Sequence, residues 1–84
     1  MTRAGSQCAR MLLNYLDAPR TDLQMAALLG LPESRISARR GWLADRYLVC
    51  WVEDVAGPFG AMNGKYGLTI QGVAVAQKLK ESLI

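Results

Sequence analysis

The sequence predicts a mostly helical α+β domain with a three-helix core, a two-stranded β-wing and a C-terminal helix. Residues 21–48 read as two helices joined by a tight turn, which is the spacing of a helix-turn-helix unit. A run of β-branched and aromatic residues followed by a glycine-rich segment then predicts a hairpin over residues 48–68. Apolar residues at helical spacing continue from there to the C-terminus.

Length and composition indicate one folded module. The chain has 84 residues, 51% of them hydrophobic, so we expect a single domain over 1–84 with only residues 1–5 frayed. No apolar run approaches the roughly 20 residues of a membrane span, and no signal-type apolar block follows the N-terminus. We therefore expect a cytoplasmic protein without a membrane partner.

The residue types that carry most catalysis and metal binding are scarce. The chain has no histidine and two cysteines, too few to form a recognisable zinc site or an ordinary general base. We expect no metal, no cofactor and no enzymatic activity. Cys8 and Cys50 fall at positions that favour apolar side chains, so we interpret them as reduced core thiols; a disulfide is the alternative.

The first helix is expected from Gln7 to Leu16, with Ser6 as its N-cap, because apolar residues are dense there. Pro19 ends this segment. Arg20 then precedes the N-terminus of the next helix, where phosphates commonly bind to free amides. It is interpreted either as a phosphate contact or as an ordinary loop charge.

The helix pair has clear start and stop signals. Thr21 followed by Gln24 forms a capping box, and Gly30 supplies the left-handed residue that ends the first helix. Pro32 restarts a helix, which we place over residues 32–46.

The second helix of the pair carries four of the seven arginines. Helical spacing places Arg35, Arg39 and Arg46 on one side, and small or hydroxylic residues point further outward: Ser34, Ser37, Ala38 and Gly41. Small residues allow close approach to DNA, and arginine binds guanine edges or phosphates. The alternative is a solvated basic face.

After the helix pair, Leu48–Val55 predicts a strand with one face toward the core, Asn63 and Gly64 predict a hairpin turn, and Lys65–Leu68 predicts the returning strand. The charges of this wing, Glu53, Asp54 and Lys65, are net negative, whereas a phosphate-binding wing is expected to be basic. Its apolar tip could fold back on the body, contact a protein partner or insert into DNA, in that order of preference.

Thr69 is the expected N-cap of the last helix. An apolar stripe follows: Val73, Ala76, Leu79, Leu83. This stripe either mediates a homodimer through the C-terminal helix or packs on the first helix within one chain.

Two motifs resemble the winged helix-turn-helix family of the MarR and ArsR regulators. They are LPESRISARRGWLADRYLV, from Leu31 to Val49, and KYGLTIQGVAVAQKL, from Lys65 to Leu79. The resemblance implies a sequence-specific double-stranded DNA-binding protein, a small transcriptional regulator such as a repressor or a phage or plasmid control protein, with helix 32–46 in the major groove. It further implies base-reading residues Ser34, Arg35, Ser37, Ala38 and Arg39, and backbone contacts Arg20, Thr21 and Lys65. The alternative is a winged-helix protein-interaction module that uses the wing tip or the last helix.

The sequence departs from this family at two positions. Arg40 stands where an apolar core residue is usual, so either its stem packs and its guanidinium escapes sideways, or it pairs with Asp17 or Asp22. Tyr47 replaces a glycine that often has positive φ, which tyrosine resists. We therefore expect a differently shaped exit from the helix.

Overall fold

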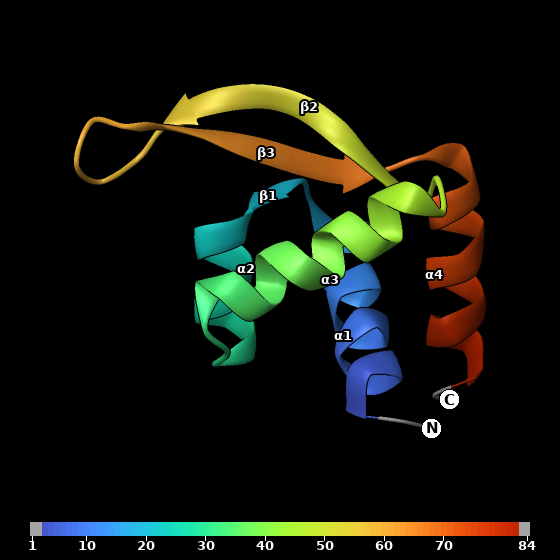
Figure 1. Cartoon of the computed structure of the whole chain (residues 1–84). Helices are drawn as coiled ribbons and strands as arrows, with labels where there is room; N and C mark the ends of the chain where they lie inside the picture. Colours follow the sequence, from blue (N-terminus) through green and yellow to red (C-terminus); the bar gives the residue numbers. More distant parts are fainter. Residues whose placement is uncertain (1–2, 83–84) are drawn as a thin grey trace.

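The computed structural model describes residues 3–82, with the side chains of residues 6–82. Its helices form one body, and an antiparallel sheet lies over one end of it and extends beyond it as a long hairpin (Figure 1). The elements in chain order are α1 (Arg3–Asp17), β1 (Arg20–Thr21), α2 (Asp22–Leu29), α3 (Glu33–Asp45), β2 (Val49–Ala56), β3 (Met62–Leu68) and α4 (Ile70–Ser82).

The first helix begins earlier than the sequence predicts. Helix α1 starts at Arg3, so Ser6 lies inside it rather than at its N-cap. Arginine and alanine both favour helix, which accounts for the extra residues in a segment expected to be frayed. Met1 and Thr2 lie outside the described residues.

The capping signals of the helix pair are confirmed. The Thr21 hydroxyl accepts a hydrogen bond from the Gln24 amide at 3.1 Å, and the Gln24 side chain accepts one from the Thr21 amide at 3.0 Å. Gly30 ends α2 with φ 67°. Pro32 is the N-cap of α3 and not its first residue, a difference of one residue at each end of the predicted 32–46 helix.

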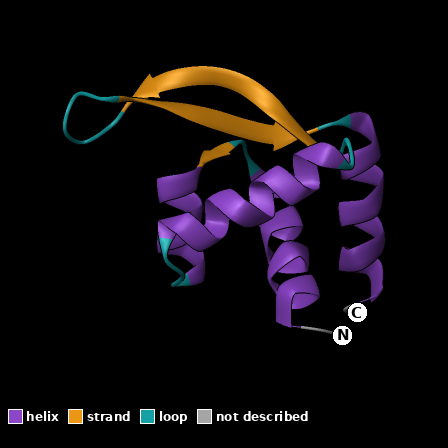
Figure 2. Ribbon diagram, in the orientation of Figure 1, coloured by secondary structure: helices purple, strands orange, loops and turns teal. Residues whose placement is uncertain are grey.

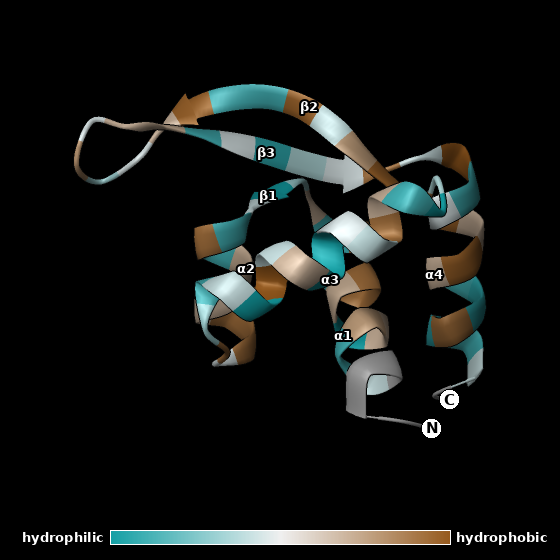
Figure 3. Cartoon of the chain, viewed as in Figure 1, coloured by the Kyte–Doolittle hydropathy of each residue, from teal (hydrophilic) through white to brown (hydrophobic). Residues whose placement is uncertain are grey.

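The core lies where α1, α2 and α3 meet, and the hydropathy colouring shows the apolar positions of these helices (Figure 3). Its largest fully buried side chains are Met11, Met25, Ile36 and Leu43. Helix α4 closes the core against α1 with Ala76. Gly72 allows α4 to approach the segment between α3 and β2, because a Cβ at that position would overlap the Leu48 carbonyl oxygen.

The sheet has three strands in the order β1-β3-β2, all antiparallel (Figure 2). The sequence predicts only the two wing strands. The additional strand, β1, contributes two residues, with Arg20 opposite Tyr66 and Thr21 opposite Lys65. A strand this short has no periodic pattern, so sequence reading assigns it to a turn.

The predicted hairpin turn at Asn63 and Gly64 is wrong. These residues lie in β3, opposite Val55 and Asp54. The chain reverses instead over 57–61, where the Gly57 amide donates to the Ala61 carbonyl at 2.7 Å and Gly60 has φ 83°. Glycines at 57, 60 and 64 are all able to form a turn, and the chain reverses at the first two of them.

The expectation that β2 turns one face to the core is also wrong, because only Val49 of this strand is buried. β2 is the outer strand of the sheet, and beyond Val49 its residues are exposed or half-buried, whereas β3 packs on the core through Tyr66 and Leu68. Cys50 is accordingly exposed, whereas Cys8 is buried, and both are free thiols. The interpretation as core thiols therefore holds for Cys8 alone, where burial raises the pKa of the thiol.

The exit from α3 keeps the left-handed geometry despite the tyrosine. Tyr47 has φ 60°, a conformation that costs a non-glycine residue about 1–2 kcal/mol. Local hydrogen bonds hold it: its amide donates to Ala44, the Leu48 amide donates to Leu43, and its carbonyl accepts from the Thr69 hydroxyl. The expectation of a differently shaped exit is therefore corrected.

Candidate nucleic-acid interface

Helix α3 lies at the surface, and its exposed side carries small side chains together with the indole of Trp42. Ile36 and Leu43 anchor its inner side in the core. Ser34, Ala38 and Asp45 on the outer side are exposed, and two of these three side chains are small. Such a surface lets the helix backbone approach a groove closely.

Arg40 stands where the family usually has an apolar core residue, and the structure shows how it is accommodated. It pairs with Asp22, one of the two acids that the sequence analysis considered as partners. Its Nε and Nη2 atoms each donate to a carboxylate oxygen of Asp22 at 2.8 Å, and its guanidinium lies 4.1 Å from the centre of the Tyr66 ring. Hydrogen bonding to Asp22 raises the pKa of Arg40. This arginine therefore connects α3 to α2 and β3.

Ser37 belongs to the same polar cluster. Its hydroxyl donates to Asp22 at 2.6 Å, and the residue is half-buried. The resemblance places Ser37 in the base-reading set, but this hydrogen bond directs its side chain toward α2. While the hydroxyl donates to Asp22, it can only accept a hydrogen bond from a base, and it cannot donate one.

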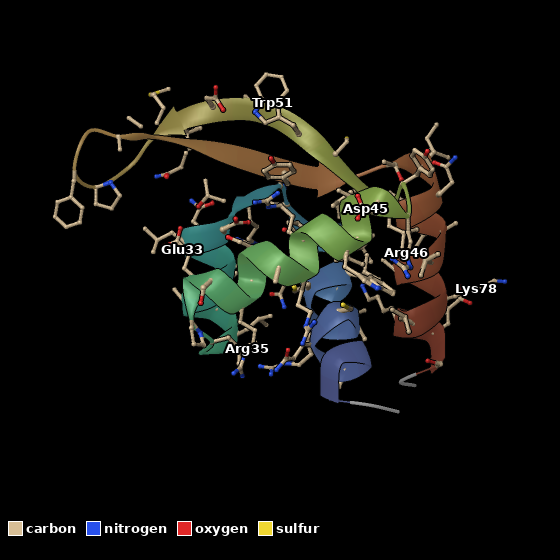
Figure 4. The ribbon with its side chains drawn as sticks, in the orientation of Figure 1. Glu33, Arg35, Asp45, Arg46, Trp51 and Lys78 are labelled. Carbon is tan, nitrogen blue, oxygen red and sulfur yellow. The ribbon has the colours of Figure 1, made fainter. Side chains whose placement is uncertain are left out.

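The remaining arginines of α3 differ in how they are held. Arg39 is half-buried and donates to the buried Gln7 of α1 at 3.3 Å. Arg46 stacks on Trp42, 3.5 Å from its ring centre, and donates to the Trp42 carbonyl. Arg35 is exposed and projects away from the hairpin (Figure 4), and within residues 6–82 its side chain makes no hydrogen bond or ion pair.

The three predicted backbone contacts lie together where β1 pairs with β3. Thr21 is buried, with its hydroxyl engaged in capping α2. Arg20 is half-buried, and its Nε atom is buried with no hydrogen-bond partner in the described part of the chain. Lys65 is half-buried opposite Glu53. Of the three, Lys65 and the outer nitrogens of Arg20 are the more available to a ligand.

The wing tip projects into solvent, so the expectation that it folds back on the body is wrong (Figure 1). Phe59 is 98% exposed and Met62 is 63% exposed. The tight turn over 57–61 and the β2–β3 pairing from Glu53 to Ala56 keep the outer part of the hairpin extended. Trp51 projects from its outer face, where the indole donates to Asp54 at 2.9 Å (Figure 4).

Among residues 3–82, no group of three or more histidine, cysteine, aspartate or glutamate side chains is arranged to hold a metal ion. No helix in that range is long and apolar enough to cross a membrane.

Comparison with known proteins identifies the fold. No family model matches the sequence, and no curated protein matches it. Among solved structures, the adhesin competence repressor AdcR of Streptococcus pyogenes superposes with a TM-score of 0.80 at 12% identity, covering 99% of this chain and 57% of that one. ZitR of Lactococcus lactis gives 0.79 at 15% identity, covering 95% and 58%. A MarR family regulator from Neisseria meningitidis gives 0.77 at 24% identity, covering 92% and 53%.

The chain has the winged helix-turn-helix fold. This winged helix spans a little over half the length of those three chains. Its helix-turn-helix is α2 and α3, and its wing is the β2–β3 hairpin. Two of the three similar proteins are named as a regulator and a repressor.

Sequence reading missed two parts of this winged helix. Asp22 was weighed only as a partner of Arg40, although it also accepts from Ser37. Arg10 was not considered, yet its side chain reaches the last carbonyl of α2. The one signal in the sequence is that Arg10 is a charged residue within a largely apolar first helix that is expected to pack against the helix pair.

Proposed function

We propose that this winged helix binds double-stranded DNA in a sequence-specific way and acts as a transcriptional regulator, with α3 in the major groove. The observation that carries the proposal is the exposed outer face of α3, where the small residues Ser34 and Ala38 lie beside the exposed Arg35. The likeness to a regulator and a repressor supports the same function. This chain shares the fold of those two proteins. A shared fold does not establish a shared activity, so DNA binding is proposed for this chain.

Within the predicted set, Ser34, Arg35 and Ala38 are the residues best placed to face bases, because all three are exposed. Ser37 and Arg39 would border the groove, held by Asp22 and Gln7. Lys65 and Arg20 would contact the backbone. Thr21 would act through α2, whose N-terminus it caps.

Titration of a fluorescent mixed-sequence duplex across a salt series tests this proposal. We expect the affinity to fall steeply as salt rises, because arginine–phosphate contacts release counterions. Selection from a random duplex library should then return a motif. Absence of binding at low salt would contradict the proposal.

A protein-interaction module is the second candidate, and the exposed Phe59 at the wing tip favours it. Phe59 and Met62, 98% and 63% exposed, lie at the same tip, and exposed apolar patches mark protein-interaction sites. Under this alternative, Phe59→Ser would abolish capture of a protein partner and leave DNA affinity unchanged. If Phe59→Ser instead weakens DNA binding, the tip belongs to the DNA interface.

Dimerisation through α4 remains a proposal. Part of its apolar stripe packs on the core through Ala76 and Leu79, while Ile70 and Val75 stay exposed. Leu83 and Ile84, which extend the predicted stripe, lie outside the described residues. Light scattering at high micromolar concentration should show a dimer that is weakened by removal of residues 80–84, and a monomer would contradict it.

A further inference from the structure

A shallow groove of about 480 Å³ runs between α1 and the start of α3. It is lined by Ser6, Gln7, Arg10, Leu31 and Arg35. Two of these five residues are arginines, and none of the described lining residues is acidic. The groove lies on the side of α3 away from the hairpin, the side toward which Arg35 projects (Figure 4).

Arg10 is held in place at this groove. Its Nη2 atom donates to the carbonyl of Leu29, the last residue of α2, at 3.2 Å. The C-terminal end of a helix carries partial negative charge, so this position favours a cation. The residue is nonetheless exposed, and a guanidinium has five N–H donors, so most of its donors remain available to a ligand.

A third guanidinium adds to the positive potential. Arg39 donates to Gln7, which itself lines the groove. Gln7 is 6% exposed, so it provides a fixed acceptor that holds Arg39 toward α1. Two arginines from two helices thus line the groove, and a third, Arg39, is held beside one of its lining residues.

The opposite side of α3 has the reverse charge. The space between α3 and β3 is lined by Asp22 and Glu33, and its arginine, Arg40, is already paired with Asp22. Phosphates would be repelled there and attracted to the groove.

We propose that this groove binds the phosphodiester backbone of duplex DNA, with Arg10 of α1 as a phosphate contact. The inference rests on the proposed function and deepens it, because it assigns a backbone strand to the α1 side of α3. A helix in the major groove is flanked by two phosphate backbones. The groove on the α1 flank would contact one of them through Arg10, while Lys65 and Arg20 are the proposed contacts on the side of the sheet.

Salt titrations of the intact chain with a mixed-sequence duplex test the groove. Arg10→Gln should lower the affinity at low salt and reduce the slope of log affinity against log salt by about 0.9, the value for one phosphate contact. Because the contact is to backbone, the selected base motif should not change. Arg10→Lys keeps the charge and should keep the slope.

Lys78→Gln is the matched control, since it makes the same change of charge on α4, where Lys78 projects away from α3 (Figure 4). Thermal unfolding of each variant separates loss of fold from loss of contact. If the wild type binds DNA and Arg10→Gln has the slope of Lys78→Gln, the groove inference is wrong and the proposed function stands. If Arg10→Lys reduces the slope of log affinity against log salt as much as Arg10→Gln does, the groove inference is also wrong, because the loss would not come from the charge. If the wild type does not bind, both proposals fail.

Discussion

The two sides of α3 use the same residue type for different purposes. On the wing side, Arg40 is paired with Asp22, lies over Tyr66 and is unavailable to a ligand. On the α1 side, Arg35 is exposed and borders a groove without acidic lining. The net charge of a helix therefore does not show which of its arginines is available to DNA. Their partners on neighbouring elements decide it.

The largest expected effect is on the wing side. Asp22→Ala should lower the free energy of unfolding by about 2–3 kcal/mol, because it leaves Arg40 partly buried without its carboxylate and removes the acceptor of Ser37. Urea unfolding measures this. Asp17→Ala is the control, since Asp17 is exposed and the change should stay within about 0.5 kcal/mol. If Asp22→Ala and Asp17→Ala lower the free energy of unfolding equally, Asp22 does not hold Arg40 and Ser37 in the way described.

On the α1 side the effect should appear in binding and not in stability. Arg35→Ala should leave the free energy of unfolding within about 0.5 kcal/mol, while costing about 1–3 kcal/mol on the preferred DNA site and relaxing base preference there. Library selection with the variant measures this. An unchanged motif with uniformly weaker binding would assign Arg35 to the backbone.

A smaller effect is expected from Tyr15, which lies close to the wing-side cluster. Its hydroxyl is buried with no hydrogen-bond partner among the described residues, so Tyr15→Phe should be neutral or stabilising by up to about 1 kcal/mol. Burial, and then the negative charge of Asp22, raise the pKa of Tyr15.

A group whose pKa is raised by folding stabilises the fold below its unfolded pKa, and that stability is lost as pH rises. Stability should therefore decline above about pH 10, where an unfolded tyrosine ionises, and less so in Tyr15→Phe. Urea unfolding from neutral to alkaline pH tests the difference. Burial also raises the pKa of the Cys8 thiol. Stability should therefore still decline somewhat with rising pH in Tyr15→Phe.

The smallest effect concerns the acidic wing. Glu53→Gln removes one negative charge near the proposed DNA surface and should raise affinity by roughly twofold, the scale of one screened charge at about 10 Å. Glu81→Gln on α4 is the control for net charge. If both variants gain equally, the wing does not approach the DNA.

The locally encoded parts of the fold were predictable from the sequence. The capping box of Thr21 and Gln24 and the left-handed Gly30 depend on neighbours within a few residues, and both are confirmed. The hairpin turn was misplaced because glycines occur at both 57–60 and 64, and local signals do not rank them. Strand β1 was missed because its only evidence is pairing with β3, more than 40 residues away in the chain.

The candidate site was less predictable than the fold. Helical spacing identified the inner and outer sides of α3, but not that Ser37 would bond Asp22 or that Arg39 would bond Gln7, 15 and 32 residues away. The groove at Arg10 could not be predicted, because it requires the packing of α1 against the turn between α2 and α3. Each of these contacts joins separate elements, and their relative placement is set by the core.

The β-bulge between Trp51 and Glu53 gives the wing a mechanical property. About six residues separate it from the tip, which at about 3.3 Å per residue is an arm of about 20 Å. A rotation of about 10° at the bulge would move Phe59 by about 3.5 Å, more than half of the roughly 6 Å width of a minor groove. A small change of strand direction at the bulge would therefore move the tip of the hairpin by several ångströms. The same change would leave the residues of α3 in place.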